Sequence, residues 1–124
     1  MLQRRTFLTG AVALLGTRAQ AQGLAEVACP AGRFTGERVE GVNRFRGIRY
    51  GRAERFRRAA AVPPSRDPVR AIAFGPACPQ RGKYRPQSED CLFLNIWTPA
   101  TDARAKLPVM VYVHGGAFAN GSVT

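Results

Sequence analysis

The sequence predicts an α/β fold with an antiparallel hairpin and the first strands of a central sheet. Apolar and polar residues alternate on both sides of Glu40-Gly41 within residues 33–50, which is the pattern of a hairpin with a tight turn. Residues 107–113 (LPVMVYV) are almost continuously apolar. Such a run is typical of strands buried on both faces, as in the parallel sheets of α/β proteins. A composition of 45% hydrophobic and 22% charged residues is that of a globular chain.

Residues 1–21 are predicted to be a twin-arginine-type signal peptide. Arg4 and Arg5 begin the motif RR-x-F-L, a short apolar stretch covers residues 7–15, and AQA at 19–21 is a small-residue cleavage site. The alternative is a general secretory signal that happens to start with two arginines. Either signal predicts an exported protein, periplasmic or secreted, and the first also predicts contact with the twin-arginine export machinery. The apolar stretch is too short to span a bilayer, so we expect no stable membrane insertion.

The second half of the hairpin shows which side chains share a face. One face should carry Val42, Arg44, Arg46 and Ile48, and the other Asn43, Phe45, Gly47 and Arg49. A glycine inside a strand pattern marks a bulge or a close approach of two backbones. We expect one of these at Gly47.

The rest of the chain divides into two connections and two strands. Residues 59–68 contain three prolines and predict an extended surface connection, and residues 71–90 read as loop. Residues 92–97 (LFLNIW) are rich in β-favouring side chains and should form a strand that ends at Pro99. The predicted strand at 107–113 then leads directly into the letters HGGAF.

The chain is strongly basic, with 19 Lys+Arg against 8 Asp+Glu and a formal net charge of +11. Arginines are concentrated between Arg33 and Arg58, where a basic patch could bind nucleic acid or an anionic surface. They alternate with apolar residues, however, and no helix-turn-helix, zinc-finger or aromatic RNA-binding motif accompanies them. We therefore expect a solvated strand face and no nucleic-acid partner.

The sequence contains no complete nucleophile and base arrangement. The serines are Ser65, Ser88 and Ser122, and none lies in G-x-S-x-G, the turn that lifts a nucleophile off its strand. His114, the only histidine, could pair with Ser88 or Ser122 in principle, but a lone histidine after an apolar strand is more often structural. One histidine and three widely spaced cysteines predict no metal site.

The pair Gly115-Gly116 is more informative. Glycines at the end of a buried strand bring bare backbone N–H groups close to whatever lies above them. Fixed donors of this kind stabilise the negative oxygen of a tetrahedral intermediate. The alternative is an ordinary turn. The position directly after 107–113 favours an oxyanion loop.

Four stretches in this order resemble the type-B carboxylesterases, which include carboxylesterases, cholinesterases and several lipases. They are FRGIRYGRAERF (45–56), FGPACPQ (74–80), SEDCLFLNIWTP (88–99) and LPVMVYVHGGAFANGS (107–122). The resemblance implies an α/β-hydrolase fold. It also implies that residues 22–124 are the N-terminal part of such a domain, truncated before the nucleophile elbow.

The resemblance also implies roles for individual residues. The oxyanion donors fall on the backbone N–H groups of Gly116 and Ala117. The family's nucleophile, acid and base all follow Thr124 in position, so His114 is not the triad base. The resemblance pairs Cys78 with Cys91 in a disulfide, the alternative being two free buried thiols, and it pairs Arg55 with Glu89. Cys29 has no family partner and reads as a small apolar strand residue.

The function that follows is a carboxylic-ester hydrolase acting on small-molecule esters through a serine, without a cofactor. The chain of 124 residues alone should be inactive, and residues 22–124 alone should aggregate or be poorly structured. Two alternatives remain open. One is a non-catalytic, cholinesterase-like binding or adhesion domain. The other, which the residues favour less, is a small basic protein that binds nucleic acid or an anionic surface.

Overall fold

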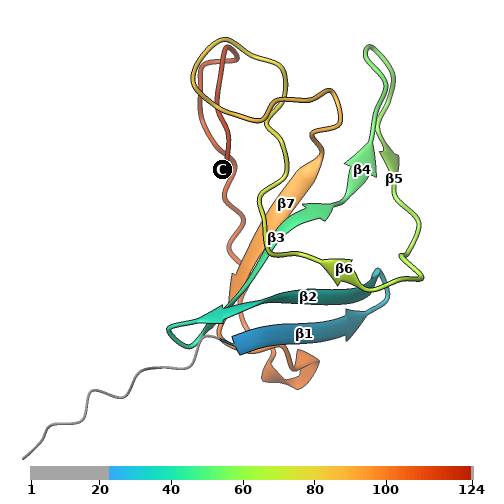
Figure 1. Ribbon diagram of the computed structural model, residues 1–124, viewed down its shortest axis with the longest axis vertical. Coiled ribbons are helices and arrows are strands. Elements are labelled where there is room, and N and C mark those ends of the chain that lie inside the picture. The colour runs from blue at the N-terminus through green and yellow to red at the C-terminus, as the bar shows by residue number, and fades with distance from the viewer. Residues whose placement is uncertain (1–22, 124) are drawn as a thin grey trace, which may run out of the picture.

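The structure, a computed structural model, describes residues 23–123 and consists mostly of β-strands (Figure 1). The main sheet has the order β1-β2-β3-β7, and β6 pairs with β2 in parallel. Its strands are β1 (Gly23–Cys29), β2 (Gly32–Val39), β3 (Val42–Arg49), β6 (Val69–Arg70) and β7 (Phe93–Thr98). A second sheet pairs β4 (Gly51–Arg52) with β5 (Ala60–Ala61), and a 3-10 helix, η1 (Ala103–Ala105), follows β7. The predicted signal peptide, with Arg4 and Arg5, lies outside the described residues.

The predicted hairpin is confirmed as β2 and β3. Val39 pairs with Val42 across a two-residue turn in which Glu40 and Gly41 have φ values of 51° and 81°. Both values are in the left-handed region, which matches the right-handed twist of the flanking strands. Asn43 and Phe45 are buried on the face predicted for them, with Phe45 only 3% exposed.

The predicted irregularity at Gly47 is also confirmed. The register between β3 and β7 shifts between Phe45 and Ile48, and Gly47 has a φ of 68°. Because of this shift, Ile48 packs against the core on the same side as Phe45, so the face predicted for Ile48 is wrong. Its N–H group donates to Asn95 Oδ1 at 2.9 Å, and a Cβ at this position would overlap the carbonyl oxygen of Ala73. Glycine is therefore required both by the backbone conformation and by the close approach of the neighbouring chain.

The core is small and lies between β1, β2, β3 and the segment after β6. It consists of Ala25, Phe34, Phe45 and Ala71, with Val27, Ile48 and Val69 packed against it. Ala71 links β2 to β3 through its backbone. Its N–H donates to the carbonyl of Thr35 at 2.7 Å, and its carbonyl accepts from the N–H of Arg46 at 2.8 Å. Among the described residues, no large side chain is completely buried. This sheet therefore has only a limited apolar interior to hold it.

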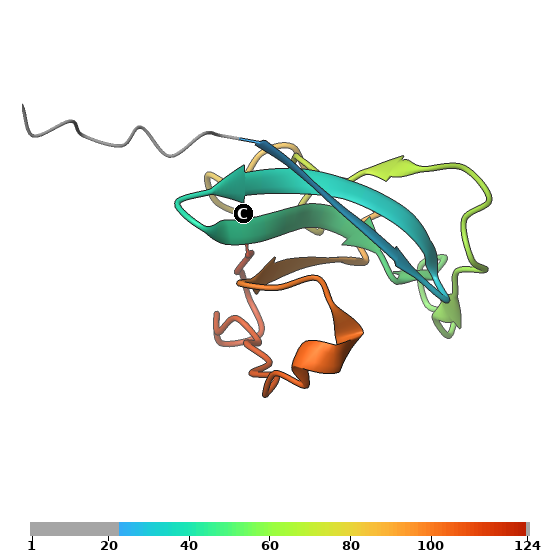
Figure 2. The same cartoon turned by 90° about the horizontal axis from the view of Figure 1, so that it is seen from below.

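The predicted strand at 92–97 is confirmed as β7, one residue further along, but the predicted interior strand at 107–113 is not formed. Residues 107–113 have no strand pairing, and Val109, Met110 and Val111 are 86%, 94% and 79% exposed. Ladder hydrogen bonds and burial come from neighbouring strands, and no strand within residues 23–123 pairs with this run. In Figure 2, η1 and the chain after it lie beyond β7, away from β1 and β2.

The predicted α/β class is therefore borne out only in its antiparallel part. Residues 23–123 contain the hairpin sheet and no α-helix, and none of their helices is long and apolar enough to cross a membrane. The connection at 59–68 is extended and mostly exposed, as predicted, apart from the short β5 at its start.

Candidate active site

Residues 114–118 (HGGAF) lie in a tight turn, the HGGAF turn, at the upper end of the C-terminal segment in Figure 1. The carbonyl oxygen of Gly116 accepts hydrogen bonds from the N–H groups of Ala119 at 2.9 Å and Asn120 at 3.2 Å. Gly116, Ala117 and Phe118 have φ values of 141°, 49° and 60°. A Cβ on Gly116 would overlap the carbonyl oxygen of Asn120, so this turn has no room for a side chain at position 116.

The two residues proposed as oxyanion donors lie next to each other in this turn. Ala117 is exposed and Gly116 is half-buried. Within residues 23–123, the backbone N–H groups of Gly116 and Ala117 have no hydrogen-bond acceptor. Consecutive N–H groups without internal acceptors can bind an external anion. The turn therefore has the hydrogen-bonding capacity that the prediction requires.

His114 and two of the serines make local contacts. His114 Nδ1 lies 2.8 Å from the carbonyl oxygen of Gly115, and the ring is exposed. The Ser65 hydroxyl donates to the carbonyl of Asp67, and Ser88 Oγ accepts from the N–H of Asp90. These contacts are those of local turns and do not assemble a nucleophile with a base.

Gln80 makes a contact with the C-terminal segment that the sequence does not predict. Its side-chain amide pairs with both backbone groups of Gly121, donating from Nε2 at 2.9 Å and accepting at Oε1 at 2.6 Å. Asn95 adds a longer hydrogen bond, of 3.5 Å, to the carbonyl of Val123. The loop at 78–88 and the C-terminal segment therefore lie side by side, as Figure 1 shows. A polar residue between Cys78 and Cys91 carries no periodic signal, so only the tertiary structure reveals this contact.

Arg55 and Glu89 lie in direct contact, between the β4–β5 hairpin and the loop before β7. Hydrogen bonding to Glu89 and its negative charge raise the pKa of the Arg55 guanidinium. The two side chains are 61% and 58% exposed, so solvent and salt screen the pair. Beside it, Arg49 pairs with Asp90 and lies over the ring of Phe93 at 4.5 Å, a pairing the sequence did not predict.

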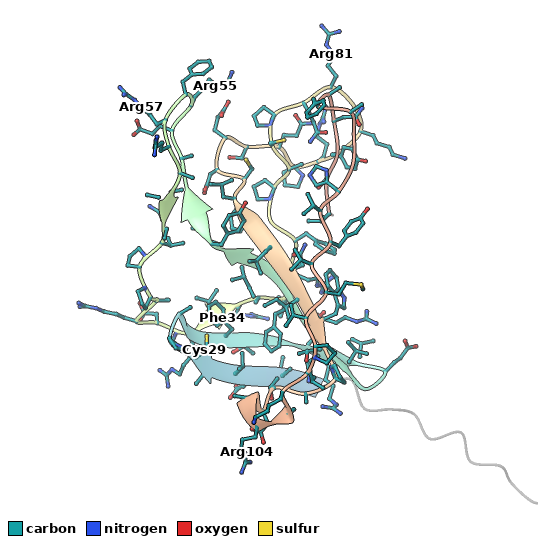
Figure 3. All side chains as sticks on the ribbon, turned by 180° about the vertical axis from the view of Figure 1, so that it is seen from behind. Cys29, Phe34, Arg55, Arg57, Arg81 and Arg104 are labelled. Carbon is teal, nitrogen blue, oxygen red and sulfur yellow. The ribbon has the colours of Figure 1, made fainter. Side chains whose placement is uncertain are left out.

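The cysteines are all free thiols in the structure, so the predicted Cys78–Cys91 disulfide is not formed there. Burial raises the pKa of the Cys91 thiol, and the nearby Cys78 and Glu89 raise it further. Cys91 therefore carries little thiolate at neutral pH, and a bond to Cys78 needs an oxidising environment to form. Cys29 is a strand residue as predicted, but it is exposed at the end of β1 (Figure 3).

The arginines of β3 are partly buried rather than fully solvated. The Arg46 guanidinium pairs with Glu37 and lies 5.2 Å from the ring centre of Phe74, while Arg44 lies 3.9 Å from Glu40. Arg55 and Arg57 project from the tip of the β4–β5 hairpin, and Arg81 projects from the neighbouring loop (Figure 3). Much of the positive charge on β3 is thus compensated locally by carboxylates.

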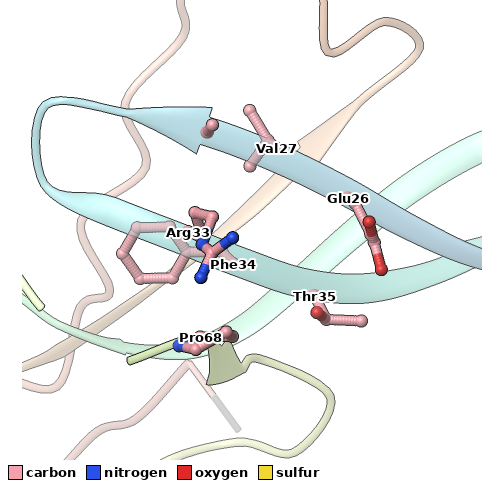
Figure 4. Close-up of a pocket in the computed structure, with 7 residues that line it drawn as sticks. Glu26, Val27, Arg33, Phe34, Thr35 and Pro68 are labelled. Carbon is pink, nitrogen blue, oxygen red and sulfur yellow. The ribbon is translucent and has the colours of Figure 1, made fainter. Parts of the chain in front are cut away.

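A shallow pocket of about 290 Å³ lies on the β1–β2 face (Figure 4). Phe34 and Pro68 line it together with the charged side chains of Glu26 and Arg33. In Figure 1 these strands are at the opposite end of the molecule from the HGGAF turn. The pocket is therefore not part of the candidate active site.

Comparison with known proteins identifies the class to which this sheet and turn belong, the carboxylic-ester hydrolases. The profile of the carboxylesterase family matches residues 24–124, and the chain belongs to this family.

Several relatives agree with this result. The chain is 37% identical over 103 residues to the para-nitrobenzyl esterase of Bacillus subtilis (strain 168), covering 73% of this chain and 21% of the relative. It is 35% identical over 127 residues to the acetylcholinesterase of Danio rerio, covering 84% of this chain and 20% of that relative.

Solved structures give the same picture. An esterase from Clostridium hathewayi that hydrolyses aliphatic aromatic polyesters superposes with a TM-score of 0.74 at 39% identity, over 82% of this chain and 24% of that one. A carboxylesterase of Geobacillus stearothermophilus superposes with a TM-score of 0.69 at 40% identity, over 78% of this chain and 21% of that one. The chain spans about a fifth of the length of the curated relatives it matches.

Proposed function

We propose that this chain supplies the oxyanion-binding part of an exported serine carboxylesterase that acts on small-molecule esters. The observation that carries the proposal is the pair of N–H groups on Gly116 and Ala117, which have no acceptor within residues 23–123 and lie in a turn that requires glycine at position 116. Family membership supports the reaction class. A serine outside this chain would attack the ester carbonyl and form an acyl-enzyme, which water then hydrolyses.

In this scheme the chain contributes electrostatic stabilisation only. The ester oxygen becomes negative as the tetrahedral intermediate forms, and the two N–H groups of the turn would donate to it. Each such donor contributes about 3 kcal/mol when it is fixed in advance. No cofactor enters this chemistry.

The first prediction concerns activity with and without the rest of an esterase. The chain of residues 1–124 should not hydrolyse p-nitrophenyl butyrate above background, because it has donors but no activated nucleophile. A chimera should hydrolyse it, if residues 24–124 replace the matching segment of the Bacillus subtilis esterase. Initial rates at 400 nm, read as p-nitrophenolate release, provide the measurement.

Two outcomes would contradict the proposal. The first is turnover by residues 1–124 alone that Gly116→Pro abolishes, which would place a complete site in this chain. The second is a chimera that folds, as judged by circular dichroism, but remains inactive. That result would favour the non-catalytic binding role.

We also propose that the protein is exported and that export allows Cys78 and Cys91 to pair. The support is the RR-x-F-L motif at the N-terminus and the short range between the two thiols, since Cys78 lies close enough to raise the pKa of Cys91. A loop of this size gains about 3 kcal/mol from a disulfide in the chain-entropy model.

The second prediction tests export and pairing together. Expressed in a bacterium, the periplasmic protein should begin at Gln22 and have a mass lower than that of the reduced form by two hydrogen atoms. Only Cys29 should then react with iodoacetamide. Replacing both Arg4 and Arg5 by lysine should leave the protein in the cytoplasm with three reactive thiols. A periplasmic protein with three free thiols would refute the pairing.

A further inference from the structure

We infer that Gln80 is a positioning residue that holds the HGGAF turn in the shape in which Gly116 and Ala117 can act. This inference rests on the function proposed above. The evidence is the pair of hydrogen bonds between the Gln80 amide and Gly121, at 2.9 Å and 2.6 Å. One side chain thus satisfies the carbonyl and the N–H of a single residue that lies 41 positions away in the chain. A pair of this kind fixes both the position and the orientation of that peptide segment.

Gly121 transmits this constraint to the turn because the two are packed in direct contact. Gly121 is buried, and a Cβ on it would overlap the ring of His114 and the carbonyl oxygen of Gly115. The next residue back, Asn120, has its carbonyl oxygen against Gly116. A displacement of Gly121 toward the turn must therefore move the backbone of Gly115 and Gly116, because these groups are already in contact.

Gln80 is itself held firmly by its own loop. Its N–H donates to Gln87 Oε1 at 3.0 Å, and its Nε2 also donates to the carbonyl of Cys78 at 3.1 Å. The loop is anchored at its base by Ala77, which is 5% exposed and exchanges backbone hydrogen bonds with Pro86 and Ser88 at 3.0 Å and 2.9 Å. A positioning residue needs a fixed conformation of its own, because donors that must reorganise during the reaction stabilise the transition state less.

The consequence concerns kcat rather than substrate binding. Gln80 bonds to the backbone of Gly121 rather than to the Gly116 and Ala117 donors, so it acts only through the placement of two N–H groups. Those groups bond most strongly to the oxygen when it is negative, in the transition state. Loss of the Gln80 amide should therefore lower kcat and leave KM nearly unchanged.

The third prediction uses a pair of variants in the same loop, Gln80→Met and Arg85→Met. Both side chains donate to backbone carbonyls of this loop, Arg85 to those of Gly82 and Tyr84, but only Gln80 reaches the segment at 114–121. In hydrogen exchange followed by mass spectrometry on the esterase chimera, Gln80→Met should speed exchange in peptides covering residues 114–123. Arg85→Met should not. Peptides from β2 and β3 should be unchanged in both variants.

The same variants in the esterase chimera give the kinetic readout. Gln80→Met should lower kcat about 10–100-fold with KM within about twofold, since it misplaces donors rather than deleting them. Gln80→Glu keeps an acceptor for the Gly121 N–H and should retain more of the kcat than Gln80→Met. Arg85→Met should stay within about threefold of the parent kcat.

The results separate this inference from the proposed function. Equal exchange rates at 114–123 in both methionine variants, or equal kcat values, would overturn the role of Gln80. If Gly116→Ala in the chimera also leaves kcat unchanged, then the oxyanion role itself fails. A large loss with Gly116→Ala and none with Gln80→Met would refute only the positioning role. If Gln80→Met fails to fold, a Gln80→Glu variant that folds and retains the full parent kcat and exchange protection would overturn the inference.

Discussion

Gly116→Ala is expected to lower the kcat of the esterase chimera about 100–1,000-fold, which is the usual cost of losing an oxyanion donor. The backbone of Gly116 has a φ of 141°, a region that L-residues rarely enter. The added Cβ would also overlap the carbonyl oxygen of Asn120. The turn must therefore open, and the N–H groups of Gly116 and Ala117 move with it.

Gly115→Ala is the matched control for this prediction. It makes the same chemical change at the neighbouring position, where a Cβ meets no atom within 4 Å and φ lies outside the left-handed region. We expect its kcat to remain within about threefold of the parent chimera. Steady-state kinetics with p-nitrophenyl butyrate, together with thermal unfolding, would check both variants. Equal kcat values for Gly116→Ala and Gly115→Ala, at equal stability, would mean that position 116 tolerates a side chain as well as position 115 does. That result would remove the argument for the donors.

The hairpin could be predicted from sequence because every signal for it is local. The alternation assigns the faces of residues 42–45, the pair Glu40-Gly41 assigns the turn, and Gly47 assigns the bulge. Beyond the bulge the alternation fails, because the register shift turns Ile48 to the core side. These features depend on residues that are neighbours in the chain. β7 was predicted for the same reason, from β-favouring side chains followed by Pro99.

The parts that failed depend on contacts between distant residues. Residues 107–113 have the composition of an interior strand, but a strand forms only where a neighbouring strand supplies hydrogen bonds. β1 has only one buried residue, Ala25, and so gives a weak pattern. The pairing of Gln80 with Gly121 and that of Arg49 with Asp90 each join residues about 40 positions apart. Sequence spacing alone does not indicate such pairs.

The candidate site shows the same division. Gly116 and Ala117 were predicted from the letters HGGAF and the family resemblance, because a turn that places bare N–H groups needs glycine at one position. What keeps this turn in place could not be predicted, since the support comes from a polar side chain in a separate loop. The local sequence therefore determines the conformation of the turn, and tertiary contacts determine where the proposed donors lie.

The exposed run at 107–113 should make the isolated chain associate with copies of itself. Val109, Met110, Val111, Tyr112 and Val113 are all at least 76% exposed, and the run carries no charge. Its backbone groups after Pro108 are free to pair with those of a second chain. Unpaired, apolar, β-favouring segments of about six residues are typical sites of strand-to-strand association. The net positive charge of residues 22–124 opposes this contact, so added salt should strengthen it.

Val111→Lys should therefore weaken self-association at least about tenfold, because pairing of two copies would bring like charges together or bury them. Ala103→Lys is the control, since it adds the same charge on the exposed η1, outside the run. Sedimentation velocity at several concentrations of residues 22–124 would measure both variants against the parent chain. A general effect of charge would make the two variants equal. A monomeric parent chain with a cooperative thermal transition would show that residues 107–113 do not act as a pairing surface at all.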